Sequence, residues 1–454
     1  LRVSPFFSMS TLGAQRRGGG PPPTFGFRAE LSGSYNEFIP LSGNEAEKNL
    51  FRAERDFGGD ANLNLDILPG REWSSRLRAG VGRRLRPAAQ AVAVRGDRIV
   101  WVGSDAEAQS LDSGRARLVD CNGQTLVPGF VDAHCHLLAY ASSLLAIDCG
   151  PSAVSSIEDV KAEMRKGAAQ RPRGEWVRAT GYSEFDLAEG RHPDRHDLDE
   201  AAPHHPVKLS HRSGHAVVLN SLALERVGIR TDTPDPTDGV IEHDSATGEP
   251  TGLLLEMDSH LDGRVHPLSE DELGKGMEMG NRRLVSLGIT AVQDATPTNN
   301  SERWEVLRRW KKRGVLAPHV TMMAGTDHLE ALMESGLVFG STDDDLRLGP
   351  VKIMATTTTG ELKPTYDELR YRVRTAHEAG FPAAVHAVEA EAVDVAVDIL
   401  ASEQGSTERC GFEFRDRLEH CSECLPETLA RLRDSRVVVV TQPGFLYHHG
   451  DRYL

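Results

Sequence analysis

Two histidines separated by one residue stand where a metal ion could be bound. His134 and His136 follow a short apolar run that ends at Val131. In an extended chain, residues two apart point to the same side, so both imidazoles face one point and Cys135 faces the other way. Neutral imidazole nitrogens suit a borderline-soft divalent cation such as zinc. The pair therefore predicts a metal site to which it contributes two ligands.

Three further residues with ligand chemistry stand at or near the ends of later predicted strands: Lys352, His386 and His420. Each taken alone has an ordinary explanation, as a hydrogen-bonded histidine or a lysine in a salt bridge. In a parallel barrel, however, the residues at the carboxyl ends of the strands share one mouth. We therefore expect all five side chains to converge there.

The elements that must position these residues are repeated βα units. From Pro128 onward, short apolar runs alternate with longer helical patterns, which is typical of a parallel sheet. The predicted strands are Gly129–Asp132, Thr290–Gln293, His319–Met323, Val351–Met354, Ala383–His386, Arg417–Glu419 and Val437–Thr441. Apolar residues at helical spacing predict helices at Tyr366–Glu378 and Ala387–Leu400. The fold class is α/β, a (β/α)-barrel of the eight-stranded type whose eighth strand is missing.

Three regions divide the chain. Residues 1–85 are rich in Gly, Pro and Arg without periodicity, which indicates a disordered or unrelated extension. Residues 86–127 predict part of a β-sandwich, and residues 128–454 form the barrel. A long gap at about 138–287 separates the first two barrel strands and must hold an insertion. Such an insertion could cover the barrel mouth and determine substrate specificity.

The β-sandwich portion is predicted from short β-branched runs. Ala91–Val94 and Ile99–Val102 flank a turn and predict a hairpin. Leu118–Cys121 and Gln124–Val127 predict two further strands. A small β-domain is therefore expected before the barrel.

Composition narrows the class of partner. The 52 Lys and Arg against 67 Asp and Glu give a formal net charge of −15, which argues against a nucleic-acid surface and favours a small-molecule substrate. No run approaches the roughly 18 apolar residues of a membrane span, so no membrane partner is expected. Six Cys without regular spacing do not indicate a disulfide framework, which favours a reducing, cytoplasmic location. The sequence leaves a homo-oligomer open.

The segment Val127–His136 resembles the opening metal motif of the amidohydrolase superfamily. Later segments resemble the branch that contains N-substituted formamide deformylases. These segments are Ser210–Ser221, Gly288–Asp294, Val351–Met354, Ala384–His386 and Arg417–His420. The resemblance covers Ala91 to Leu454 and implies a metal-dependent hydrolase acting on a non-peptide carbon–nitrogen bond through metal-activated water.

The resemblance also implies a binuclear centre with two zinc ions. His134 and His136 would bind one ion, His386 and His420 the other, and an N-carboxylated Lys352 would bridge them. Carboxylation is required because an ammonium group has no lone pair, whereas a carbamate has two anionic oxygens. A mononuclear deaminase of the same superfamily, with a structural Lys352, remains the alternative enzyme.

Residues of the insertion are implied to face the substrate. His211 and His215 belong to one such segment, and Tyr182 lies in another. Asp294, at the end of the second strand, is a further candidate. We expect catalytic roles for Lys352, His215 and Asp294, and substrate binding by His211, His215 and Tyr182, with a structural role as the alternative for the insertion residues.

The sequence departs from the family pattern after the seventh strand. The family's eighth strand ends in an Asp that binds metal and moves a proton, but here only a short segment follows Thr441. Asp451 would lie in a loop, so it is not assigned that role. Loss of a general acid/base costs ~10²–10⁴-fold in rate, so we expect low activity. An inactive, truncated or degenerate product is therefore the non-enzyme alternative.

Overall fold

The structure, a computed structural model, describes residues 89–444 with gaps at 97, 112–115, 123, 125, 237–238, 262, 404–405, 410–411 and 443. Before residue 89 it describes only β1 (Arg2–Val3), β2 (Leu31–Ser32), β3 (Arg52–Asp56) and β4 (Asn62–Asp66). Most of the predicted extension at residues 1–85, and also Asp451, lie outside the described residues.

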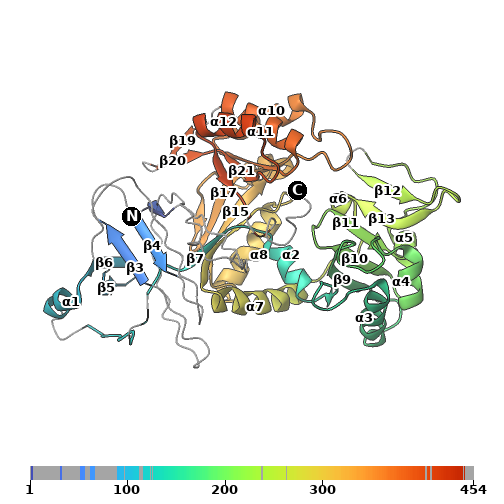
Figure 1. Cartoon of the computed structure of the whole chain (residues 1–454), viewed down its shortest axis with the longest axis horizontal. Coiled ribbons are helices and arrows are strands. Elements are labelled where there is room, and N and C mark those ends of the chain that lie inside the picture. Colours follow the sequence, from blue (N-terminus) through green and yellow to red (C-terminus); the bar gives the residue numbers. More distant parts are fainter. Residues whose placement is uncertain are drawn as a thin grey trace, which may run out of the picture.

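Seven parallel strands form the central sheet, in the order β22-β21-β18-β17-β15-β14-β7. Figure 1 shows this sheet between the N-terminal hairpin and the insertion. Their bounds are β7 (Phe130–Cys135), β14 (Ile289–Asp294), β15 (His319–Gly325), β17 (Leu346–Met354), β18 (Ala383–Ala387), β21 (Arg417–His420) and β22 (Val438–Val440). The short β16 (Thr342–Asp343) pairs antiparallel with β17. Each of the seven predicted strands overlaps an observed one, so the parallel α/β architecture is confirmed.

Strand β17 begins five residues earlier than its predicted start at Val351. The sequence Gly349-Pro350 would normally end a strand, because proline cannot donate to the ladder. The pairing between β15 and β17 shifts register between Met322 and Ala324, opposite this dipeptide. A local irregularity of this kind accommodates the proline and lets the strand continue.

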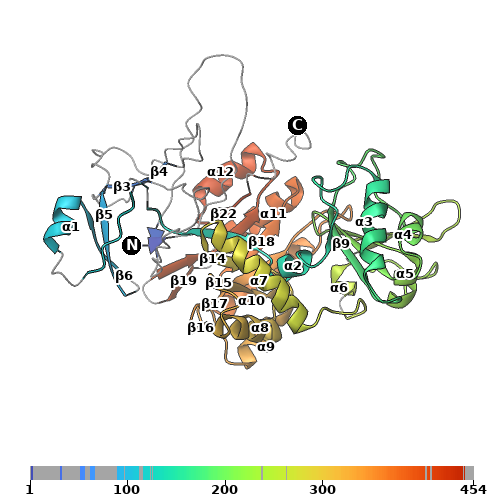
Figure 2. The same cartoon turned by 90° about the horizontal axis from the view of Figure 1, so that it is seen from below.

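Helices follow the barrel strands and cover the outside of the sheet (Figure 2). They are α7 (Glu270–Ser286), α8 (Ser301–Lys312), α9 (Leu329–Glu334), α10 (Tyr366–Glu378), α11 (Ala390–Ser402) and α12 (Pro426–Asp434), with the 3₁₀ turn η2 (Thr326–His328) before α9. The prediction of α10 is confirmed to the residue. Helix α11 starts at Ala390 rather than Ala387 because β18 continues to Ala387. Buried Leu, Ile, Val and Met side chains fill the layer between helices and sheet.

The two outer strands of the series are β7 and β22. Within the described part of the chain, neither pairs with another strand on its outer side. The described strands therefore form an incomplete barrel. A hairpin of β19 (Ser406–Arg409) and β20 (Phe412–Arg415) precedes β21 without joining the barrel sheet.

The insertion is an α/β unit with a sheet of its own, in the order β12-β13-β11-β10-β9-β8. It lies to one side of the barrel in Figures 1 and 2. Its strands are β8 (Ile147–Asp148), β9 (Val177–Tyr182), β10 (Val207–His211), β11 (Ala216–Leu219), β12 (Val240–His243) and β13 (Pro250–Leu255). Its helices are α3 (Ile157–Ala169), α4 (Arg195–Ala201), α5 (Ser221–Val227) and α6 (Asp258–Leu261). Strands β8, β9 and β10 are parallel, and β11 to β13 are antiparallel to their neighbours.

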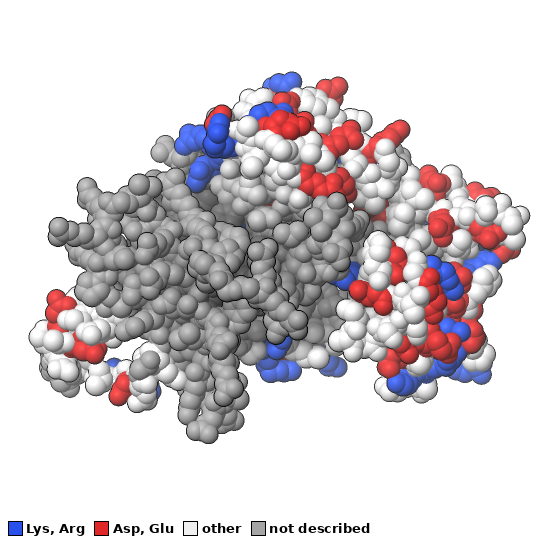
Figure 3. Space-filling view, viewed as in Figure 1, with Lys and Arg blue, Asp and Glu red and all other residues white. Residues whose placement is uncertain are grey.

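Separate apolar clusters pack this insertion sheet. Met164 of α3 and Leu198 of α4 belong to one cluster, and Leu224 of α5 belongs to the other. Ion pairs also join α3 to α4, where Lys161 lies 2.6 Å from Glu200. The visible surface of this unit carries both signs of charge (Figure 3). With its own core, the insertion is more than a loop over the barrel.

The N-terminal hairpin is confirmed as β5 (Ala91–Arg95) and β6 (Arg98–Gly103), which are followed by α1 (Asp105–Leu111). The prediction of a strand at Leu118–Cys121 is wrong, since these described residues form none. Leu118 is 85% exposed, so its apolar side chain finds no packing partner that would hold a strand there. The described residues within Gln124–Val127 are not in a strand either. No described helix is long and apolar enough to cross a membrane.

Candidate metal centre at the carboxyl ends of the barrel strands

Four histidines from three barrel strands meet at the carboxyl end of the sheet. His134 lies in β7 and His136 directly follows it, with ring centroids 5.3 Å apart. His420 ends β21, and its ring centroid lies 4.5 Å from that of His134. The ring centroid of His386, from β18, lies 4.5 Å from that of His420. The structure thus brings together the four imidazoles singled out in the sequence.

Lys352 comes from β17 and is 1% exposed. Its Nζ has no hydrogen-bond partner, so Lys352 is not the salt-bridged lysine of the ordinary explanation. Burial lowers the pKa of Lys352 to about 8, against the opposing effect of Glu419. Burial also lowers the pKa of His420 to about 3 and that of His386 well below its usual range. Both imidazoles are therefore neutral at pH 7 and keep the lone pair that a metal ligand needs.

Side-chain oxygens hold the Nδ1 atoms of three of these histidines. The partners are Glu419 Oε2 at 2.6 Å for His134, Thr296 Oγ1 at 3.1 Å for His136 and Gln442 Oε1 at 2.7 Å for His420. Metal-binding histidines commonly use one nitrogen in this way, which orients the ring and assigns coordination to the other nitrogen. In His134 the other nitrogen, Nε2, is buried without a hydrogen-bond partner.

Glu419 is fully buried and is itself held by Arg417. The Arg417 Nε donates to Glu419 Oε1 at 2.7 Å, and Arg417 also bonds Gln293 and the Ala133 carbonyl. Burial alone would raise the pKa of Glu419, but the Arg417 charge and the hydrogen bond from His134 hold it well below its usual range. The carboxylate is thus ionised and fixes the His134 ring.

Asp294 ends β14 and is completely buried. Its Oδ2 accepts from the Leu137 backbone N–H at 2.8 Å, and its Oδ1 accepts from Thr296 N and Asn299 Nδ2, both at 2.9 Å. These bonds hold the chain directly after His136 and the residue that contacts His136 Nδ1. Asp294 therefore fixes the backbone that follows His136 and the position of Thr296.

Helix α2 (Leu137–Ser143) starts immediately after His136 and packs tightly on α7. A Cβ at Gly276 of α7 would lie 2.2 Å from the Ala141 carbonyl oxygen. Only glycine permits this approach of the two backbones. The close packing fixes the position of α2, and with it the end of β7 that carries the histidines.

The side chains of this site carry donor atoms that suit a divalent metal, but they do not form a coordination shell in this structure. Among the described residues, no group of three or more His, Cys, Asp or Glu is arranged to hold one ion. Two buried nitrogens without partners, His134 Nε2 and Lys352 Nζ, nevertheless face a site lined by neutral imidazoles. A buried polar atom without a partner is costly, so its satisfaction by a ligand is favourable.

The insertion contributes His215 to the same region. Its ring centroid lies 5.9 Å from that of His386, so the start of β11 in the insertion lies beside the carboxyl end of the barrel strand β18. The His215 Nδ1 lies 2.9 Å from Glu256 Oε1. The structure thus joins the predicted His215 to the barrel site and adds a carboxylate beside it.

Tyr182 and His211 lie at the ends of β9 and β10 and form a cluster within the insertion. The Tyr182 hydroxyl lies 2.9 Å from His192 Nδ1, and His211 Nε2 lies 3.0 Å from Glu184 Oε2. Burial lowers the pKa of His211 to about 4, although Glu184 opposes this. The contacts of this cluster run within the insertion rather than to the barrel histidines.

Several site residues were not identified from the sequence. Arg417 and Glu419 alternate with Leu418 in a buried strand, and a charged pair on one face of such a strand is a usable signal. Glu256 gives no such signal, because only the pairing of β11 with β13 brings it beside His215. His192 likewise depends on the fold of its loop.

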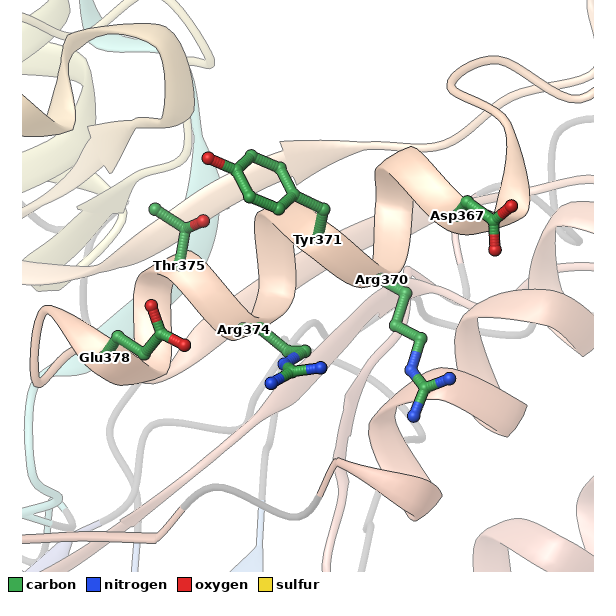
Figure 4. A pocket seen from close by; sticks show the side chains of 6 residues that line it. All are labelled: Asp367, Arg370, Tyr371, Arg374, Thr375 and Glu378. Atoms are coloured by element: carbon green, nitrogen blue, oxygen red, sulfur yellow. The ribbon is translucent and has the colours of Figure 1, made fainter.

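A surface pocket lies elsewhere, along the outer side of α10 (Figure 4). Its lining comes from this helix alone: Asp367, Arg370, Tyr371, Arg374, Thr375 and Glu378. None of the site residues lines it, and Tyr371 is 69% exposed. The pocket does not bear on the chemistry at the strand ends.

Comparison with known proteins fixes the family. The model of the amidohydrolase family matches residues 117–454, which include both the barrel and its insertion. The chain belongs to the amidohydrolase family. It is accordingly an enzyme of the amidohydrolase type, and the resemblance noted in the sequence is confirmed.

The N-substituted formamide deformylase of Arthrobacter pascens is 28% identical over 392 residues, which are 80% of this chain and 71% of that protein. Two solved structures of uncharacterized metal-dependent hydrolases share the fold. The one from Pyrococcus horikoshii has a TM-score of 0.60 at 22% identity, covering 80% of this chain and 72% of that one. The one from Pyrococcus furiosus has a TM-score of 0.57 at 24% identity, covering 80% and 75%.

Proposed function

We propose that this amidohydrolase cleaves a non-peptide amide bond of a small molecule and uses divalent metal ions held at the carboxyl ends of the barrel strands. One observation carries the proposal. His134, His136, His386 and His420 converge from three strands, and the nitrogen atoms His134 Nε2 and Lys352 Nζ are buried there without partners. A buried polar atom without a partner is costly, and a bound ligand would satisfy both of these nitrogens.

The residues that would hold the metal ions are the four histidines and Lys352. Zinc is the ion that best suits neutral imidazole donors. A bound divalent cation supplies Lewis acidity toward the amide carbonyl and toward water. Lys352 would contribute as a carbamate, because its ammonium form has no lone pair to donate.

The position of Lys352 favours two metal ions over the mononuclear deaminase. A structural lysine that is 1% exposed would be expected to pair with a carboxylate, yet its Nζ has no hydrogen-bond partner. A bridging carbamate would give this buried nitrogen a role. Two metal ions per chain and a rate that depends on CO₂ would distinguish the binuclear site from the deaminase.

The surrounding residues orient and enclose the reacting groups. Glu419, supported by Arg417, holds the Nδ1–H of His134. Asp294 fixes the backbone after His136. His215 approaches from the insertion and is our candidate for contact with the reacting amide. Tyr182 and His211, at the ends of parallel strands in the same insertion sheet, are our candidates for binding the distal part of the substrate.

The test is hydrolysis of a panel of N-substituted formamides and acetamides by zinc-loaded protein, with the released amine measured by chromatography. The Arthrobacter deformylase suggests the formamides as the first substrates. We expect turnover that a chelator abolishes, zinc restores and H134N removes. A protein that binds zinc through these residues but cleaves no amide in the panel would contradict the proposal.

A further inference from the structure

A carboxylate and a histidine form a cross-strand pair at one end of two central strands of the insertion sheet, β11 and β13. Strands β11 and β13 are antiparallel, with Ala216 opposite Leu255, so His215 and Glu256 occupy the next position of the ladder. The Glu256 backbone N–H donates to the His215 carbonyl at 2.9 Å. The His215 Nδ1 lies 2.9 Å from Glu256 Oε1 and 3.1 Å from Oε2. Backbone and side chains thus tie the two residues together twice.

The backbone of Glu256 has an unusual conformation. Its φ is +54°, in the left-handed region that residues other than glycine seldom adopt. Residues held in this region tend to occur at functional sites, where the surrounding structure imposes the conformation. Here the conformation follows the last residue of β13 and accompanies the contact between the carboxylate and the imidazole.

The pair faces the proposed metal centre. The His215 ring centroid is 5.9 Å from that of His386. The side chains of His215 and Glu256 are 35% and 18% exposed, so the histidine lies nearer to solvent than the carboxylate. This is the arrangement expected of a histidine that meets a substrate and is supported from behind.

A neutral imidazole has one N–H, and its donation to a carboxylate determines which nitrogen carries it. We propose that Glu256 is a positioning residue that fixes His215 with its hydrogen on Nδ1, so that Nε2 accepts a hydrogen bond from the N–H of the amide substrate. This inference rests on the proposed amide hydrolysis. It deepens that function by naming the class of substrate: amides that keep one hydrogen on nitrogen, in preference to N,N-disubstituted amides.

The physical basis of this selection is the hydrogen-bond acceptor itself. A site built to bond an N–H group discriminates strongly against an analogue that lacks it, because its own polar group is then left unpaired. A methyl group on the amide nitrogen both removes the hydrogen and occupies its place. Discrimination should therefore depend on the tautomer that Glu256 imposes.

The first experiment reads the tautomer of His215 in zinc-free protein by proton–nitrogen NMR at mildly alkaline pH. The His215 signal is the one that disappears in H215N. We expect the Nδ1–H form in the wild type and the Nε2–H form, which a free histidine side chain favours, in E256G. Glycine suits the positive φ, so E256G should fold. A His215 with its hydrogen on Nε2 in the wild type, or the same tautomer in both proteins, would overturn the proposal.

The second experiment compares kcat/KM of the zinc-loaded protein for para-nitroformanilide and for its N-methyl derivative. We expect the wild type to prefer the N–H compound at least about tenfold, and E256G to lose most of that preference. E256Q keeps the side-chain shape and should lose less. The control is E242Q, since Glu242 lies on β12 of the same sheet, is exposed and bonds Thr251.

The outcomes separate the two levels of inference. If the wild type hydrolyses both compounds equally well, the role of Glu256 is refuted while amide hydrolysis stands. If the wild type hydrolyses neither compound, the result counts against the proposed function, and the NMR tautomer then decides the role of Glu256 by itself. An equal loss of preference in E242Q would assign the effect to the sheet rather than to Glu256.

Discussion

The substitution Glu419→Gln should weaken metal binding at a residue that does not itself bind metal in our proposal. Glu419 is fully buried, accepts the His134 Nδ1–H at 2.6 Å and pairs with Arg417 at 2.7 Å. Glutamine keeps the shape but removes the charge that orients His134. Loss of such a supporting partner typically lowers metal affinity about 10–100-fold. We expect a zinc Kd raised by that factor.

The same substitution should also cost stability. Arg417 has 12% of its side chain exposed and would lose Glu419, its ion-pair partner inside the barrel. Breaking a buried pair on one side costs about 3–5 kcal/mol, and the retained amide oxygen places the expected loss near the lower bound, about 3 kcal/mol. Urea unfolding of zinc-free protein measures this loss of stability separately from metal binding.

Zinc titration against a chromogenic chelator, with E419Q, the double variant R417M/E419Q and E427Q, separates the two effects. Removing both buried charges should restore part of the stability but none of the zinc affinity. E427Q, on the exposed start of α12, should change neither. A folded E419Q that binds zinc as tightly as the wild type would refute the argument that Glu419 orients a metal ligand.

Three further predictions concern other parts of the molecule. K352M should abolish metal-dependent hydrolysis. It should leave the free energy of unfolding equal or higher, because it replaces a buried amine without a partner by an apolar side chain. A large loss of stability would show that Lys352 is structural. G276A should lower the free energy of unfolding by about 1–3 kcal/mol and weaken zinc binding, because its Cβ would lie 2.2 Å from the Ala141 carbonyl oxygen. An unchanged urea midpoint would show that α2 and α7 adjust freely. The pKa of His211 in the folded protein is lowered to about 4 from 6.5. As the pH falls from 6.5 toward 4, the unfolded chain therefore binds a proton at His211 that the folded protein does not, and the free energy of unfolding falls. The wild type should therefore lose about 2 kcal/mol more than H211Q between about pH 8 and about pH 5, and parallel pH profiles of the two proteins would contradict this.

The sequence determined the barrel series and its principal side chains. Short apolar runs and helical patterns locate the seven parallel strands and the helix Tyr366–Glu378, because apolar residues must be buried wherever the fold places them. His134, His386 and His420 lie in the last two residues of their strands, so the topology alone brings them to one mouth. Lys352 follows from the same rule, two residues before the end of β17.

Prediction from the local sequence failed where the formation or the extent of a strand depends on the strand that it pairs with. Leu118–Cys121 has the composition of a strand, but no described strand pairs with it, and an unpaired run cannot satisfy its backbone in a sheet. The continuation of β17 through Pro350 depends on a register shift in its pairing with β15, which the sequence of β17 does not contain. These differences arise from neighbours rather than from propensity.

Contacts between distant segments were decided by the tertiary structure alone. Three histidines are held by residues far from them in the sequence. Glu419 contacts His134, Thr296 contacts His136 and Glu256 contacts His215. Side-chain hydrogen bonds of this kind depend on rotamers and on positions set by several packed elements at once. The sequence therefore located the candidate ligands, and only the packed fold decided which side chains contact their rings.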